Sequence, residues 1–271
     1  MILDDPKLKL RELAEAVHIS YGLVYNILHE KLEARKLCSR WVPCSLTIDQ
    51  KRIRVTTSKR NLDMFRNKSS EFLCRYVTMD ETWIHHYTPE SREEAKEWVL
   101  PGGSAPKRSK TQQSAGKVMA SVFWDAHGII FIDYLEKGKT ITGAYYSALL
   151  YQLKDENKKK RPHLQKKKIL FHHDNAPAHT STIAQAKLHE LKFELLPHPP
   201  YSPDLAPSDY YLFGNLKKWF SGQRFTSNEE VEWATDGYFH ELDKSHYLKG
   251  VQMLENRWTR CIELKGDYVE E

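Results

Sequence analysis

The sequence predicts a mixed α/β domain preceded by a short all-α segment. Apolar residues in the first thirty positions recur at helical spacing, and from residue 72 onward short β-rich runs alternate with amphipathic helical runs. Such alternation is typical of helices packed on a mixed sheet. We therefore expect three parts: a partial helix-turn-helix at 1–30, a basic linker and helix at 31–70, and the α/β domain at 71–271.

The first thirty residues have the pattern of a helix-turn-helix. Lys9–Val17 is expected to be a helix, His18 and Ile19 its turn, and Ser20 the cap of a second helix, Tyr21–His29. The core-facing residues would be Leu10, Leu13, Ala14, Val17, Val24, Ile27 and Leu28. Facing outward, toward the major groove if this is a DNA-recognition helix, would be Ser20, Tyr21, Tyr25, Asn26 and His29. An ordinary amphipathic helical hairpin explains the same pattern equally well.

The rest of the chain is expected to alternate between strands and helices. Residues 31–46, interrupted by Pro43, are typical of a linker, and 47–67 of a basic helix. That helix would carry Arg54 and other basic residues on a stripe that faces either DNA or solvent. The expected strands are 75–79, 117–124, 129–135, 168–172 and 193–196. The expected helices are 142–157, 180–191, 208–220, 228–242 and 247–262.

Charge is distributed unevenly along the 271 residues. Residues 1–70 carry +6 and residues 71–226 carry +5, whereas residues 227–271 carry −6. A basic front and middle suit a polyanionic partner, and the runs Lys158–Arg161 and Lys166–Lys168 could contact phosphates, although solvated turns explain them too. We expect no membrane span and no signal peptide, because no apolar run is long enough. Four cysteines without CxxC spacing fit a reducing compartment.

Three aspartates stand where strands end or a helix begins. Asp80 and Asp174 follow expected strands, and Asp209 opens the helix after a proline-rich loop. Side chains at strand ends of an open sheet point into one crevice, so these carboxylates can converge there. Converging carboxylates are hard oxygen ligands that suit Mg²⁺ or Mn²⁺. Each aspartate taken singly is also a common turn residue or helix cap.

Three sequence blocks surround these aspartates. They are 77–83 (VTMDETW), 173–179 (HDNAPAH) and 200–213 (PYSPDLAPSDYYLF), with 34 residues between the second and third aspartates. These blocks strongly resemble the signature blocks of mariner transposases, and the spacing matches that family as well. Further family landmarks are resembled by residues 41–43, 116–119, 217–219 and 257–262. The resemblance therefore covers essentially the whole chain.

The resemblance implies an RNase H-like (retroviral-integrase-like) catalytic fold, in which Asp80, Asp174 and Asp209 are the catalytic residues and hold Mg²⁺ or Mn²⁺. It implies cleavage and transfer of DNA strands at transposon terminal inverted repeats, in the nucleus, with double-stranded DNA as the partner. It also implies a homodimer, in which a clamp loop at about 88–115 reaches the Trp-Val-Pro linker of a second subunit. Contacts to phosphates in trans would come from Lys107, Arg108 and Lys110. A plain surface loop accounts for this segment equally well.

Other polar residues near the blocks are weaker candidates. On a strand end, Glu81 would point away from Asp80. Asp204 is better explained as a turn residue, and a helix cap explains His179 as well as a functional role does. A zinc site built from His172, His173 and His179 lacks a second ligand group at suitable spacing.

The sequence departs from the family at its N-terminus. Family members carry two helix-turn-helix motifs, whereas here the first is absent and residues 2–5 resemble only the tail of the second motif's opening helix. We therefore expect a weak grip on transposon ends. The alternative to a transposase core is a domesticated or decaying DNA-binding protein without turnover. Mariner domains also occur fused to a histone-lysine methyltransferase, the SETMAR arrangement, and no part of this sequence resembles a SET domain.

Overall fold

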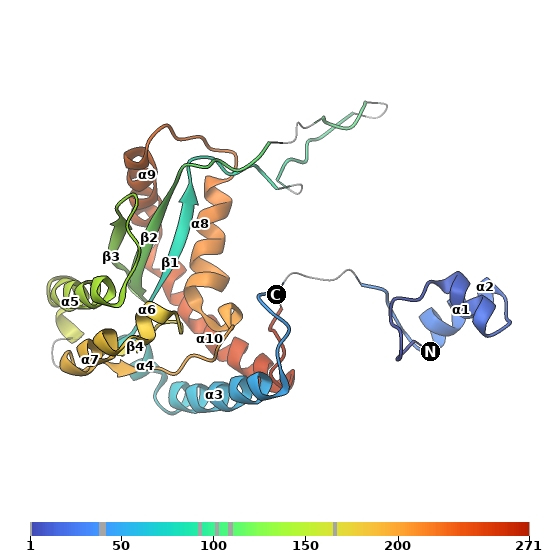
Figure 1. Ribbon diagram of the computed structural model, residues 1–271, viewed down its shortest axis with the longest axis horizontal. Coiled ribbons are helices and arrows are strands. Elements are labelled where there is room, and N and C mark those ends of the chain that lie inside the picture. Colours follow the sequence, from blue (N-terminus) through green and yellow to red (C-terminus); the bar gives the residue numbers. More distant parts are fainter. Residues whose placement is uncertain are drawn as a thin grey trace. The chain divides into compact units, whose positions relative to one another are not determined.

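The computed structural model describes residues 2–37, 42–91, 94–100, 103–107, 111–164 and 167–270 (Figure 1). The chain divides into two compact units, Met1–Pro43 and Cys44–Glu271. This division differs from the expected boundaries, because the helix of the basic segment belongs to the second unit. No helix of the described part is both long and apolar enough to cross a bilayer.

The first unit is a small helical hairpin. It consists of α1 (Leu10–Ala16), α2 (Tyr21–Asn26) and the π-helical turn η1 (Ile27–Lys31), the last two where one helix was expected. The Ser20 hydroxyl caps α2 by accepting a hydrogen bond from the backbone N–H of Leu23 at 3.3 Å. The core consists of Leu13, Ala14, Val24 and Leu28.

Two residues expected in this core lie outside it. Val17 is 44% exposed and Ile27 is 37% exposed. The prediction was wrong for them because two short helices bury only a narrow stripe, with no third layer to cover the flanks. The five outward-facing residues of the second helix are all exposed, as expected.

A five-stranded mixed sheet forms the centre of the second unit. Its strands are β1 (Tyr76–His85), β2 (Lys117–Asp125), β3 (Gly128–Leu135), β4 (Leu170–His172) and β5 (Glu194–Leu195). They lie in the order β3-β2-β1-β4-β5, with β1, β2 and β3 antiparallel and β4 and β5 parallel to β1. The mixed sheet with interleaved helices confirms the predicted α/β class.

Helices cover both faces of the sheet (Figure 1). One apolar layer joins Val77 and Met79 of β1 to the helices on one face, and the other joins Tyr76 and Ile84 to those on the opposite face, as strand alternation requires. The first layer holds α5 (Gly143–Lys160) and α7 (Thr182–Glu190), with the short α6 (Pro177–Thr180) before α7. The second holds α4 (Ser69–Arg75), α8 (Phe213–Phe220), α9 (Asn228–Glu241) and α10 (Lys244–Glu263).

The basic helix α3 (Ile48–Asn67) packs along α10. Thr47 and Gln50 close its N-terminus with a capping box, which the sequence pattern TxxQ encodes. Arg54 does not belong to the exposed basic stripe in which it was expected, because its side chain is fully buried. It forms a two-pronged ion pair with Asp204, at 2.8 Å and 2.6 Å. The predicted turn residue Asp204 is thus an anchor between α3 and the loop before Asp209.

The segment between β1 and β2 leaves the sheet as a long excursion (Figure 1). Tyr87 and Thr88 tie its base to the stretch after α8 by two isolated bridges. Among its described residues, Trp98 is fully exposed, as is Leu100 for the most part, and Lys107 is exposed as well. Arg108 and Lys110 lie outside the described residues.

Candidate active site

Asp80 and Asp174 are brought level by the pairing of β1 with β4. The parallel register ends where Thr78 pairs with His172, and each aspartate lies two residues beyond that pair. Neighbouring strands are about 4.8 Å apart, so side chains at the same level of two parallel strands are neighbours. β1 itself continues to His85, paired with β2 alone, so the expected strand end at Met79 was wrong. Asp80 and Asp174 therefore lie where β4 has ended and β1 continues beside it.

Asp209 belongs to an element that packs on the face of the sheet toward which Asp80 points. It lies in the π-helical turn η4 (Ser208–Leu212), which precedes α8 where a single helix was expected. The first residue of that turn is fixed in place because its hydroxyl accepts a hydrogen bond from the buried Trp124 indole at 3.0 Å. The Asp209 and Asp80 carboxyls are close enough to influence each other's pKa.

The pKa values of Asp80 and Asp209 are both shifted upward. Burial, together with the charges of Asp209, Glu81 and Asp174, raises the pKa of Asp80 well above its ordinary value. Burial raises the pKa of Asp209 to about 6, although its interaction with Asp80 and the charge of Lys217 act the other way. Like charges crowded at one place resist ionising together. The cluster is therefore a site of concentrated negative charge that a cation would relieve.

Asp174 has a different partner, His179. Its Oδ1 atom lies 2.6 Å from His179 Nδ1 and accepts the backbone N–H of Ala176 at 2.9 Å. Against the effect of burial, these bonds lower the pKa of Asp174. The other ring nitrogen of His179 lies 3.1 Å from Glu81. Burial opposes the charged imidazole, yet the two carboxylates prevail and raise the pKa of His179 to about 10.

His179 and Glu81 are residues whose role the sequence did not reveal. Glu81 points to the opposite face of β1 from Asp80, as the alternation of a strand requires, and meets a buried imidazolium there. Of the two alternatives for His179, the helix cap is not formed, because His179 lies inside α6 and Ser181 caps the next helix through its hydroxyl. The acidic residue directly after Asp80 and a histidine five residues after Asp174 were the available signals.

His172 and His173, which precede Asp174, are buried in the core. His172 bonds the Tyr76 hydroxyl at 2.6 Å and His198 at 3.0 Å, and His173 bonds the Tyr146 hydroxyl at 2.7 Å. Burial lowers the pKa of His172 well below its ordinary range and that of His173 to about 3. A zinc cluster of these histidines is not formed.

The donor set fits a divalent metal by its chemistry. Within the described part of the chain, no three His, Cys, Asp or Glu side chains are already arranged around a common point as a metal cage. Asp80 and Asp209 influence each other's pKa, however, and Asp174 stands level with Asp80. These are hard oxygen donors whose mutual repulsion a divalent cation neutralises. For all three carboxylates to bind the same metal site, the Asp174 carboxylate must rotate partly away from His179.

Comparison with known proteins identifies the family of the chain. Residues 88–167 match the family model described as transposase (partial DDE domain). The chain is 37% identical to the mariner Mos1 transposase of Drosophila mauritiana over 96% of its own length and 74% of that protein. The chain belongs to the mariner transposase family. It is also 35% identical to the human histone-lysine N-methyltransferase SETMAR, over 98% of this chain and 38% of that protein.

Solved mariner structures share the fold of this chain. The structure of the Mos1 paired-end complex with Mn matches with a TM-score of 0.85 at 36% identity, over 99% of this chain and 78% of that chain. The Mos1 catalytic domain alone matches with a TM-score of 0.71 at 36% identity, over 85% of this chain and all of that chain. The predicted RNase H-like fold of the catalytic unit is confirmed.

Proposed function

We propose that this mariner family member is the core of a DNA transposase, which cuts DNA strands at transposon terminal inverted repeats and joins them to target DNA. What supports the proposal is that Asp174 stands level with Asp80 on the neighbouring parallel strand and that Asp80 and Asp209 influence each other's pKa. The three come from β1, the segment after β4, and η4. Carboxylates gathered in this way from distant parts of a chain are costly to the fold unless they serve a site.

Each residue has a distinct task in this proposal. Asp80 stands on the rigid central strand and Asp209 on a turn held by Trp124, so both oxygen donors are preset in position. His179, itself held by Glu81, orients the Asp174 carboxylate. A bound DNA backbone would lie across the three aspartates.

The proposed cofactor is Mg²⁺ or Mn²⁺, held by Asp80, Asp174 and Asp209. Mos1 paired-end complexes were solved with Mn and with Mg. When bound between such carboxylates, two divalent cations supply activation of the attacking oxygen and stabilisation of the departing oxygen of a phosphodiester. The protein's own contribution is the fixed geometry and the negative charge that attracts the ions.

The proposed partners are double-stranded DNA and a second copy of the chain, in the nucleus. The described part of the excursion between β1 and β2 exposes Trp98 and Leu100, two large apolar side chains close together in the chain that a partner would cover. We assign them to contacts with the linker of the second subunit, and Lys107 to DNA phosphates in trans. The exposed residues of the second helix of the first unit would contact the major groove: Ser20, Tyr21, Tyr25, Asn26 and His29.

The decisive experiment measures nicking of supercoiled plasmid and joining of the freed 3′-hydroxyl. Wild-type protein is expected to nick in Mg²⁺ or Mn²⁺ and not in EDTA, and Asp174→Ala to lose nicking altogether. Asp155→Asn, an exposed aspartate on α5, is the matched control and should keep wild-type rates. Equal nicking by wild type and Asp174→Ala would overturn the proposal.

The same assay separates the proposal from the DNA-binding alternative. A protein without turnover would bind duplex DNA in a salt-sensitive manner and cut in no divalent metal. For the dimer, Trp98→Ser is expected to shift the protein with DNA toward monomer in sedimentation. Trp233→Ser on α9, which is also exposed, should leave the assembly unchanged.

A further inference from the structure

A basic hollow lies at the end of the sheet opposite the aspartates. It measures about 540 Å³ and is formed by the C-terminal ends of α5 and α7 and by the residues that lead into β4 and β5. Its floor is apolar and includes Leu164, Ile169 and Phe193. A volume of this size falls within the range of small-molecule sites, roughly 300–1,000 Å³. Nothing in the transposase proposal uses it.

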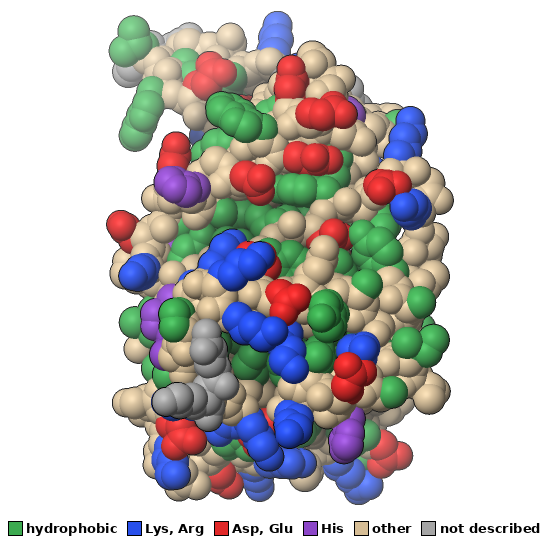
Figure 2. Space-filling model, turned by 90° about the vertical axis from the view of Figure 1, so that its left-hand side faces the viewer, with side chains coloured by type: hydrophobic (Ala, Val, Ile, Leu, Met, Phe, Trp, Pro, Cys, Tyr) green, Lys and Arg blue, Asp and Glu red, His purple; other side chains and the backbone are tan. Residues whose placement is uncertain are grey.

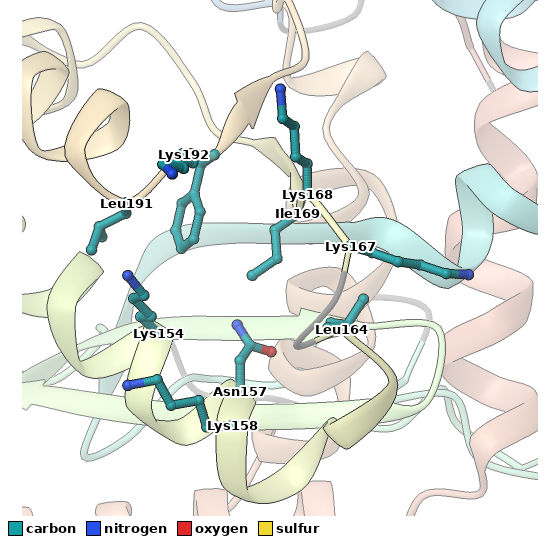
Figure 3. Close-up of a pocket in the computed structure, with 10 residues that line it drawn as sticks. Lys154, Asn157, Lys158, Leu164, Lys167, Lys168, Ile169, Leu191 and Lys192 are labelled. Atoms are coloured by element: carbon teal, nitrogen blue, oxygen red, sulfur yellow. The ribbon is translucent and has the colours of Figure 1, made fainter.

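Asn157 is the polar group at the centre of the hollow. It continues the buried stripe of α5 one turn beyond Leu153, at a position where the pattern calls for another apolar residue. Its side chain is only 3% exposed, and neither its amide nitrogen nor its amide oxygen has a hydrogen-bond partner. In Figure 3 the amide points into the space between Lys154, Ile169 and Leu164. Buried amides without partners are rare, because their lost hydration is not replaced.

The rim of the hollow is positively charged. Five of the ten described lining residues are lysines and none is acidic. One of them, Lys192, adopts φ 58°, a left-handed conformation that favours glycine at this position after a helix. Figure 2 shows Lys and Arg side chains gathered in the lower half of the face that carries α5 and α7. The rim therefore suits an anion.

We propose that this hollow binds a nucleotide. A planar base fits the apolar floor, where it would stack on the partly exposed ring of Phe193, which itself packs against the buried Phe171. The paired donor and acceptor of Asn157 match the edge of a purine, as Asn does when it reads adenine. The phosphates would lie among Lys154, Lys168 and Lys192. The nucleotide is either free or the terminal residue of a DNA strand, and both present the same chemistry.

The hollow and the aspartates are separate sites at opposite ends of β4. Ile169 and Asp174 stand on either side of β4, about five residues or roughly 16 Å apart along an extended chain. Nucleotide binding in the hollow can therefore be measured in EDTA, where the transposase reaction does not occur. Loss of one activity leaves the other testable.

The test is calorimetric titration of the full chain with ATP, AMP, tripolyphosphate and a single-stranded oligo(dA). ATP or oligo(dA) is expected to bind, and Asn157→Leu to weaken that binding at least tenfold. Asn157→Leu should also raise Tm, since it replaces an unpartnered amide by an apolar group of similar size. A raised Tm excludes unfolding as the cause of lost binding. Lys192→Ala should weaken binding as well, and Lys137→Ala, outside the hollow, should not.

The outcomes separate the two sources and can overturn the proposal. Binding of ATP and AMP that oligo(dA) does not displace identifies a free nucleotide, whereas binding of oligo(dA) alone identifies a DNA end. Tripolyphosphate binding as tightly as ATP, with no effect of Asn157→Leu, would reduce the hollow to a lysine patch and refute the base site. Failure of every ligand to bind would refute it too.

Discussion

The ion pair between Arg54 and Asp204 makes a sharp prediction about stability. Arg54 is fully buried on α3, and Asp204 is 10% exposed in the loop that leads to Asp209. The guanidinium also donates to Ser202 at 2.6 Å and to the backbone carbonyl of Gly266 at 2.8 Å. Arg54→Met keeps most of the buried volume and removes every one of these donors.

The loss of unfolding free energy in Arg54→Met depends on the Asp204 carboxylate that is left without its partner. Removing one partner of a buried pair leaves an uncompensated carboxylate, which costs about 3–5 kcal/mol. Asp204 keeps one hydrogen bond, from the backbone N–H of Val269 at 2.8 Å, so the lower half of that range is expected. For a domain of this size, each 1 kcal/mol lowers Tm by about 2–4 °C, so Arg54→Met should lower it by about 6–16 °C.

Urea denaturation followed by circular dichroism, in EDTA, measures the effect. The matched control is Arg52→Met on the same helix, whose ion pair with Asp49 is exposed and should be worth less than about 1 kcal/mol. Adding Asp204→Asn to Arg54→Met removes the stranded charge and should recover about 1–3 kcal/mol. A loss below about 1 kcal/mol for Arg54→Met, or no recovery in the double variant, would refute the reasoning.

Three further predictions concern the metal-free protein in EDTA. The pKa of His179 is raised from 6.5 to about 10, so its contribution to stability is complete below pH 6.5 and is lost as pH rises through 10. Over this pH range the free energy of unfolding of wild type should fall by a few kcal/mol more than that of His179→Gln. Parallel curves of unfolding free energy against pH for the two proteins would contradict a charged His179. Loss of hydration around its carboxyl raises the pKa of Asp209 from 3.8 to about 6, so its ionisation opposes folding progressively between these values and fully above them. Asp209→Asn should therefore stabilise the protein at pH 7.5 by about 1 kcal/mol, a figure kept low because part of the residue remains in contact with water, and a lower Tm would count against it. Arg161→Met strands the buried carboxylate of Asp125 and should cost about 3 kcal/mol in thermal denaturation, an expectation that a loss under 1 kcal/mol would exclude.

The sequence by itself determined the elements and the chemistry of the aspartates. Strand and helix periods set the α/β class, because an element must bury one face and its pattern shows which. The helix ends at Ser20 and Thr47 were also local, since a cap bonds backbone groups only three residues away. The three blocks around Asp80, Asp174 and Asp209 indicated the family. That the three aspartates lie close together in space was only a prediction at that point.

The tertiary structure decided everything that depends on residues far apart in the chain. Whether a basic residue faces solvent or an internal carboxylate cannot be read from its own helix, and so Arg54 was placed on the wrong face. His179 became a charged link between Glu81 and Asp174 because the fold brings its ring within hydrogen-bond distance of Glu81, a residue 98 positions earlier in the chain. Asn157 was expected only as the last residue of the helix 142–157, and its burial without hydrogen-bond partners became visible only with the residues that lead into β4 and β5. How deeply a side chain is buried and which charged groups it meets are set only when the helices and strands pack together. The free energy of ionising that side chain depends on both.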